Sequence, residues 1–259
     1  MSDLRATSPG AAPVDLSPHL RPVGDQGRRG TCVAFAVTAA HEHRRGPGHD
    51  HVPEDLSEET LYWGCKQLDG IPASGTNMTA ADLALQRWGQ PTEALWPYDP
   101  TLDDCAPGYQ PPPEAIKVQN CYRNALRPIA PSLSAIRAEL DASQPVIIGL
   151  TVWEGFRRAD TEPLPAPTKS ELLPGGHAVV AIGYDPQRAA LLIRNSWGIR
   201  WGRGGYLWVA DAVVPLLLGA WVIAGAPASE ALTAAANVIF TQRIRKHESR
   251  RLSTAGRKN

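Results

Sequence analysis

Cys32 stands where a protein chain can make a thiol reactive. It follows Thr31, a residue suited to cap a helix, and it opens an apolar, Ala-rich run that continues to Glu42. Unpaired backbone N–H groups and the helix dipole favour negative charge in a first helical turn, so they favour the thiolate form of a cysteine placed there. The sequence therefore makes Cys32 a candidate nucleophile, and the plain alternative is a small apolar residue of the core.

Three polar residues elsewhere in the chain could assist such a thiol. His177 begins an apolar, strand-like run, which would hold an imidazole base at the start of a strand. Asn195 ends a later strand-like run, where its amide could accept from an imidazole and fix the ring's tautomer. Gln26 lies in a Gly-rich loop before Cys32 and could donate to an oxyanion. The plain alternatives are a solvated residue at a strand start for His177, a tight turn for Asn195 and an ordinary loop amide for Gln26.

The chain changes character near residues 111–113, which are three consecutive prolines. Before them, the pattern predicts helices over 32–42, from 57–63 onward and over 80–88. After them, it predicts a short strand over 116–119, a helix that begins at Ser132 or Ser134 and ends at Leu140, and strands over 146–152, 177–184, 190–194 and 205–210. A helical lobe followed by a β-rich lobe is an α+β architecture.

Taken together and in order, these blocks resemble the papain-like cysteine peptidases of the C1 family, in a bacterial form without a pro-segment. The resemblance is carried by PVGDQGRRGTCVAF at 22–35, GHAV at 176–179 and RNSWG at 194–198, followed by WG at 201–202 and GY at 205–206. Weaker echoes are LSE at 56–58, WPY at 96–98 and QPV at 144–146. The resemblance implies a two-lobe fold: a helical N-terminal lobe, an antiparallel β-barrel-like C-terminal lobe, and an active-site cleft between them.

The same resemblance implies a role for each candidate residue. Cys32 would be the nucleophile, His177 its base, Asn195 the residue that orients the imidazole, and Gln26 an oxyanion donor. The implied reaction is hydrolysis of peptide bonds through a thioester acyl-enzyme, with no cofactor and no metal. The implied substrate-binding residues are Ser74, Gly75, Gly176 and Trp197.

Several positions depart from the family pattern. Arg29 stands where the family commonly has a cysteine, so the disulfide made there is absent, and Val33 stands where a tryptophan is common. Cys65 and Cys105 occupy the places of another family disulfide, which we expect to be open in a reducing cytosol. The matching region starts near Pro13, which leaves no room for a pro-segment in this sequence.

The domain prediction is an arm over 1–12, a peptidase domain over 13–226 and a tail over 227–259. Within the domain, the helical lobe covers about 20–110 and the β-rich lobe about 111–226. The tail is Ala-rich and then basic, and residues 241–259 carry seven Lys or Arg and one Glu in a chain of formal net charge +0. The charge balance gives no overall attraction to nucleic acid or membrane, and the tail could dock a partner protein.

The remaining patterns bear on location and metal binding. The longest uncharged run, 212–229, is broken by Pro and Gly, so no membrane span is expected. No signal-peptide pattern opens the sequence, which favours the cytoplasm and leaves signal-less export open. Four histidines cluster over 41–51, but their spacing does not favour a metal site.

Two alternative functions stay open at this point. One is an acyl or amide transferase that uses the same thioester with a different acceptor. The other is a catalytically silent peptide-binding module of the same fold. Cleavage preference, endo- or exopeptidase action, physiological substrate, control of activity and oligomeric state are not encoded in any pattern we can read.

Overall fold

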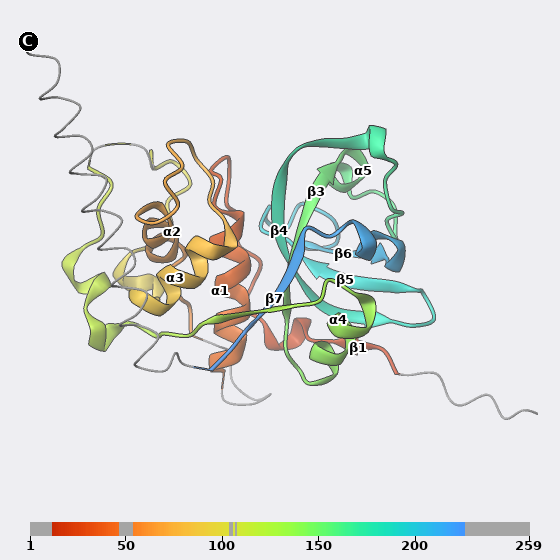
Figure 1. The fold of residues 1–259 in the computed structure, drawn as a ribbon, viewed down its shortest axis with the longest axis horizontal. Coiled ribbons are helices and arrows are strands. Elements are labelled where there is room, and N and C mark those ends of the chain that lie inside the picture. Colours follow the sequence, from red (N-terminus) through yellow and green to blue (C-terminus); the bar gives the residue numbers. More distant parts are fainter. Residues whose placement is uncertain (1–11, 47–53, 104–105, 107, 226–259) are drawn as a thin grey trace, which may run out of the picture.

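The computed structural model describes residues 12–46, 54–103, 106 and 108–225. Helices gather on one side of the molecule and an antiparallel sheet on the other, with α1 (Cys32–Arg45) at the boundary between them (Figure 1). This is the α+β, two-lobe arrangement that the sequence predicts, with the helical lobe first in the chain.

Three helices form the first lobe: α1, α2 (Glu58–Lys66) and α3 (Met78–Arg87). Helix α1 packs against both of the others, and α2 packs against α3. All three predicted helices are therefore confirmed. Short 3-10 helices flank them at Ser17–His19 and Glu93–Leu95.

A side-chain cap marks the start of α2 but not the start of α1. Ser57 caps α2, because its hydroxyl accepts from the backbone N–H of Thr60 at 3.1 Å and donates to the carbonyl of Trp96 at 2.6 Å. Thr31 precedes α1 as predicted, but its hydroxyl makes no capping bond and lies 2.8 Å from the hydroxyl of Tyr98 instead. The N–H groups of the first turn of α1 are thus left for other partners.

One antiparallel sheet forms the second lobe, in the order β2-β7-β3-β4-β5-β6, with β1 paired to β4. The strands are β1 (Val14–Asp15), β2 (Leu126–Ile129), β3 (Val146–Trp153), β4 (Leu172–Asp185), β5 (Ala190–Arg194), β6 (Tyr206–Ala210) and β7 (Gly219–Ile223). Along this path the two end strands, β2 and β6, do not pair in the described part of the chain, so the barrel-like sheet is open. The sheet carries α4 (Leu133–Asp141), α5 (Glu154–Arg158) and 3-10 helices at Lys169–Glu171 and Asp211–Leu216.

The strand predictions were right for four runs and wrong for one. Strands β3, β4, β5 and β6 cover the predicted runs, and Ser132 rather than Ser134 caps α4. The expected strand over 116–119 is instead two 3-10 helices, Pro113–Ile116 and Val118–Asn120. Consecutive prolines fix φ and remove backbone donors just before this run, so it starts as a turn. Strands β1, β2 and β7 were not predicted.

Helix α1 joins the lobes because its β-facing side is made of small residues. Helix α1 contacts β4, β3 and β7, and its Ala36 and Ala39 line one pocket together with Val179 and Val180 of β4. Small side chains let the helix axis approach the sheet closely and hold the two lobes in one relative position.

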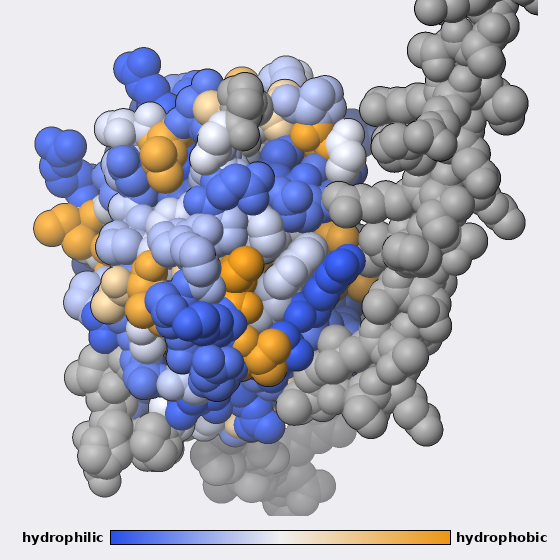
Figure 2. Space-filling model, turned by 90° about the vertical axis from the view of Figure 1, so that its left-hand side faces the viewer, coloured by the Kyte–Doolittle hydropathy of each residue, from blue (hydrophilic) through white to orange (hydrophobic). Residues whose placement is uncertain are grey.

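The face that the helical lobe turns outward is mostly hydrophilic, with small separate apolar patches (Figure 2). Within the described residues, no helix is both long and apolar enough to cross a bilayer.

We expect Ser57→Ala to lower the free energy of unfolding by about 1–2 kcal/mol, because it removes a cap and leaves a buried carbonyl without its donor. Ser132→Ala is the matched control, since that cap is only partly buried and its bond is longer, at 3.3 Å. Urea unfolding followed by circular dichroism measures both. A loss at Ser57 no larger than that at Ser132 would contradict this reading of α2.

Candidate active site

Cys32 is the first residue of α1, and its thiol lies at the boundary between the lobes. The half-buried thiol is within hydrogen-bond reach of the backbone N–H of Ala178 on β4. The N–H groups of Cys32 itself and of Val33 also interact with the sulfur, as expected at a helix N-terminus. Since Ala178 directly follows His177, the packing of α1 on β4 brings the candidate nucleophile to the candidate base.

His177 and Asn195 are joined by a hydrogen bond of 2.7 Å between Nε2 and Oδ1. The backbone N–H of Ser196 donates to the same Oδ1 at 2.8 Å, which fixes the orientation of the amide because an N–H can only donate. The Nε2 atom must therefore be the donor that carries the hydrogen, and Nδ1 of the neutral ring is left as the basic nitrogen. This is the tautomer that a proton-accepting histidine needs.

Aromatic rings enclose this hydrogen bond. The Trp197 ring stacks on the His177 imidazole with centroids 4.7 Å apart and an interplanar angle of 30°. Phe156 of α5 packs edge-on against both rings, and the indole N–H of Trp201 donates to its carbonyl at 3.0 Å. His177 is 7% exposed and Asn195 3% exposed, so bulk water does not compete for their bond. Trp197, predicted as a substrate-binding residue, covers the imidazole.

Gln26 bridges the two lobes beside the thiol. Its Oε1 accepts from the hydroxyl of Ser196 at 2.6 Å, and its Nε2 donates to the carbonyl of Arg29 at 2.7 Å. Its backbone N–H also donates to the carbonyl of Ser196 at 2.8 Å. An amide nitrogen carries two hydrogens, so one N–H of Gln26 remains for a further acceptor.

Ser74 and Gly75 lie in a loop, residues 69–76, that packs against the loop before Cys32. The backbone N–H of Gly30 donates to Ser74 Oγ at 2.9 Å, and the N–H of Gly75 donates to the hydroxyl of Tyr62 at 2.9 Å. A Cβ at Gly30 would lie 2.5 Å from the backbone nitrogen of Gly75, so this approach requires glycine. The predicted substrate edge is therefore tied directly to the nucleophile loop.

Lys66 holds the 69–76 loop together, and this role was not predicted from the sequence. Its ammonium donates to the carbonyls of Ile71, Ala73 and Gly75 at 2.8 to 3.0 Å and pairs with Asp69 at 3.2 Å. Backbone carbonyls are its main partners, and these leave no trace in side-chain patterns.

Gly176, the last predicted substrate-binding residue, lies on β4 opposite Thr151 and next to His177. Its exposed backbone faces Leu218, whose Cδ1 would be 3.5 Å from a Cβ at this position. Leu218 is 63% exposed, so an apolar side chain borders the imidazole side of the site. Sequence reasoning missed Leu218, because only the pairing of β7 with β3 brings it here.

The other two cysteines that the structure describes, Cys65 and Cys121, take no part in this arrangement. Cys65 is a free, fully buried thiol within reach of Thr76, and burial raises its pKa to about 12. Its expected partner, Cys105, lies outside the described residues. Cys121 is half-buried, its thiol donates to the carbonyl of Ala115 at 3.3 Å, and burial raises its pKa.

Burial shifts the pKa values of the two candidate reacting groups in opposite directions. It raises the pKa of the Cys32 thiol, an effect opposed by the N–H groups of Ala178, Val33 and Cys32. It lowers the pKa of His177 to about 4, opposed by the hydrogen bond to Asn195. Each group taken alone is therefore held neutral. Burial therefore opposes a separate charge on either group.

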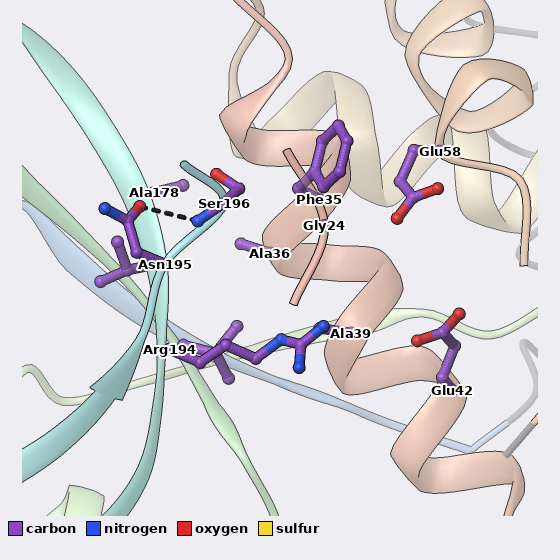
Figure 3. A pocket seen from close by; sticks show the side chains of 12 residues that line it. Gly24, Phe35, Ala36, Ala39, Glu42, Glu58, Ala178, Arg194, Asn195 and Ser196 are labelled. Carbon is purple, nitrogen blue, oxygen red and sulfur yellow. Dashed lines mark hydrogen bonds between the residues drawn. The ribbon is translucent and has the colours of Figure 1, made fainter. Parts of the chain in front are cut away.

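Side chains from both lobes line a pocket behind Asn195 (Figure 3). Arg194 reaches across from β5 toward the side of α1 that carries Glu42, and Glu58 lies beyond (Figure 3). A neighbouring cavity of about 300 Å³ shares these three residues and is lined also by Arg21, Asp55, Glu93 and Tyr98. Burial raises the pKa of Glu42 to about 8, with Asp55 adding to the effect and Arg194 and Arg21 opposing it.

In the described part of the chain, no group of three or more His, Cys, Asp or Glu is placed to hold a metal ion. His41 of the histidine cluster is buried between Gln90 and Asn124, at 2.8 and 3.0 Å. His49 and His51 lie outside the described residues.

Glu42 makes stability depend on pH in a defined direction. Its pKa is higher in the folded state than in the unfolded state, so folding favours its protonated form, and that stabilisation is lost as pH rises from about 4.5 to about 8. Glu42→Gln keeps an oxygen for the backbone N–H of Leu56 and does not titrate. We expect the stability of the wild type relative to Glu42→Gln to fall by on the order of a few kcal/mol across this range.

Urea unfolding at several pH values between those limits measures this difference. Glu154→Gln, at an exposed position at the start of α5, serves as the control. A difference between wild type and Glu42→Gln that stays constant with pH would contradict the assignment.

Comparisons with known proteins agree with the geometry of the site. A family model described as "Papain family cysteine protease" matches residues 13–215. An uncharacterized peptidase C1-like protein of Acanthamoeba polyphaga mimivirus is 28% identical over 193 residues, which are 70% of this chain and 62% of that protein. Ananain of Ananas comosus is 26% identical over 199 residues, 74% of this chain and 52% of ananain. The chain thus spans less than two thirds of either relative.

Two solved structures share the architecture. Xylellain, a cysteine protease from Xylella fastidiosa, aligns with a TM-score of 0.72 at 27% identity and covers 88% of this chain and 94% of its own. The bromelain protease from Ananas comosus, solved in complex with the E64 inhibitor, aligns with a TM-score of 0.62 at 20% identity over 83% of this chain and 99% of its own. The second likeness shows the fold alone.

Proposed function

Because the chain belongs to the papain family of cysteine proteases, we propose that it is a cysteine peptidase whose nucleophile is Cys32 and whose base is His177. One observation carries this proposal. The thiol of Cys32, at the N-terminus of α1, lies against the backbone N–H next to a histidine whose tautomer is fixed by Asn195. A nucleophile, its base and an orienting amide are the parts that acyl transfer requires.

In the proposed reaction, the Cys32 thiol gives its proton to Nδ1 of His177, and the thiolate attacks the carbonyl carbon of a peptide bond. The C–S bond forms while the carbonyl π electrons move onto oxygen. The oxyanion then collapses, the C–N bond breaks, and His177 gives its proton to the leaving amine. Water, deprotonated by the same nitrogen, hydrolyses the thioester to release the carboxylic acid and restore the thiol.

The environment favours this proton transfer over separate ionisation of either group. Burial penalises a lone thiolate and a lone imidazolium, as both pKa shifts show. A transfer between them leaves the net charge at zero and places opposite charges side by side in a region of low dielectric, where their attraction is strong. The helix N-terminus adds its own stabilisation of the thiolate.

Gln26 and the backbone N–H of Cys32 are the proposed oxyanion donors. One N–H of Gln26 is already bonded to Arg29, and the other is free to point at the developing charge. As the first helical residue, Cys32 has a backbone N–H without an acceptor in a preceding turn. Donors fixed before the reaction stabilise the transition state without the cost of reorganisation.

A peptide or protein in extended form is the proposed substrate. The loop that carries Ser74 and Gly75 lies against the loop before Cys32, and Gly176 with the exposed Leu218 lies next to His177. A main chain bound between these two backbones would present its carbonyl to the thiol without any cofactor.

We expect iodoacetamide at about pH 6 to label Cys32 far faster than Cys121, because an ordinary thiol is almost fully protonated there while a paired one is partly thiolate. Peptide mapping by mass spectrometry gives the site and rate. Cys121 is the internal control, since it is also half-buried and its thiol donates to the carbonyl of Ala115. His177→Ala should slow labelling of Cys32 to the rate of Cys121. Equal rates in the wild type would contradict the assigned pair.

Asn195→Ala should lower kcat by about 10- to 100-fold with a smaller effect on KM, because the imidazole loses the partner that fixes its tautomer. Hydrolysis of a p-nitrophenyl ester of an N-acyl amino acid measures this, and Asn120→Ala, on the surface, is the control. An unchanged kcat would contradict the orienting role. Repeating the assay with an added amine and analysing the products separates hydrolysis from transfer.

A further inference from the structure

Arg29 lies three residues before Cys32, and its guanidinium is buried in the helical lobe. It forms a two-point ion pair with Glu59 of α2, with N–O distances of 2.6 and 2.7 Å. The carbonyl of Asp99 accepts from the guanidinium at 2.8 Å, and the hydroxyl of Tyr109 donates to the Glu59 carboxylate. Arg29 is 7% exposed and Glu59 is fully buried. A planar guanidinium held at two points has both its position and its orientation fixed.

The main chain of Arg29 fixes the amide of Gln26. The Arg29 carbonyl accepts from Gln26 Nε2, while the hydroxyl of Ser196 donates to Gln26 Oε1. A carbonyl can only accept, so the amide cannot turn over without losing its bond to Arg29 and placing its oxygen against the carbonyl oxygen. The direction of the remaining N–H of Gln26 therefore depends on where the Arg29 backbone lies.

A tyrosine ring connects the side chain of Arg29 to the same loop. The guanidinium lies 5.1 Å from the centroid of the Tyr98 ring. The hydroxyl of Tyr98 donates to the carbonyl of Gln26 at 2.8 Å and lies 2.8 Å from the hydroxyl of Thr31. The loop that runs from Gln26 to Thr31 is thus held at both ends by a residue that Arg29 contacts.

We propose that Arg29 is a positioning residue for the reaction: its buried pair with Glu59 fixes the loop so that Gln26 aims its free N–H at the oxyanion. This inference rests on the proposed function, since it assigns a task to Gln26 within it. Arg29 itself does not contact the reacting atoms. It acts through its backbone carbonyl.

A double-mutant cycle on turnover tests this. Arg29→Lys keeps the charge and loses the two-point geometry, and Gln26→Ala removes the donor. We expect Arg29→Lys to lower kcat for the p-nitrophenyl ester by about 10- to 100-fold, a loss typical of a misplaced oxyanion donor. In the Gln26→Ala background the same change should lower kcat by less than about threefold, because the donor it positions is gone.

Alkylation of Cys32 is the second readout, because it needs the thiolate and no oxyanion donor. We expect Arg29→Lys to change the rate of labelling by iodoacetamide by less than about threefold while kcat falls. Equal losses of kcat in the two backgrounds, or an alkylation rate that falls as much as kcat, would overturn the proposal in favour of general structural damage.

Arg137→Lys is the matched control. Arg137 also pairs with a carboxylate, that of Asp211 at 2.8 Å, and also lies over a tyrosine ring, that of Tyr184 at 5.0 Å, but it belongs to the β lobe. Its replacement should leave kcat within about twofold. A loss as large as that of Arg29→Lys would show that breaking any such pair is enough, and would overturn the assignment.

If Arg29→Lys does not fold, Tyr109→Phe replaces it in the same cycle. That variant removes one donor to Glu59 and keeps the ion pair, so we expect it to lower kcat by less than Arg29→Lys does. This smaller loss should disappear in the Gln26→Ala background. A loss that persists there would overturn the proposal. If the wild-type protein shows neither turnover nor selective labelling of Cys32, the proposed function itself is overturned, and this inference with it.

Discussion

The contact between the N-terminus of α1 and strand β4 is the constraint on which the rest of the site depends. It brings together Cys32 and His177, which lie 145 residues apart on different lobes. Alanines on α1 make the approach close, and bonds between Gln26 and Ser196 tie the nucleophile loop to the strand end that carries Asn195. A shift of one lobe against the other would separate the thiol from the imidazole even with every side chain intact.

Ionisable groups are buried at three places in the molecule, and their surroundings treat the charge differently at each. At the site, burial opposes charge on Cys32 and on His177, and the proposed reaction meets this by a proton transfer within the pair. Beneath the nucleophile loop, Arg29 and Glu59 form a two-point ion pair where the family commonly has a disulfide. Between the lobes, the Glu42 carboxyl faces a cavity and carries a raised pKa. A buried ion pair such as Arg29–Glu59 contributes little net stability and fixes geometry instead.

The sequence predicted the parts whose signals are local. A helix that opens at Cys32, strands that begin or end at His177 and Asn195, and a polar loop carrying Gln26 each follow from short-range patterns, and the structure brings all four residues together. Partners set by tertiary contacts were out of reach: Glu59 beneath Arg29, the carbonyl contacts of Lys66, and Leu218, which depends on the unpredicted β7. The strand expected over 116–119 failed because three prolines before it favour turns over pairing.

The charge state of the Cys32–His177 pair is the central claim, and titration of the thiolate tests it most directly. Ultraviolet absorbance of the thiolate, taken as the difference between wild type and Cys32→Ser, follows ionisation of this one sulfur as pH rises. We expect thiolate to be present already at about pH 6, well below the ordinary thiol pKa of about 8.5. A single ionisation above that ordinary value, unchanged by His177→Ala, would show that burial alone governs the thiol and would contradict the pair.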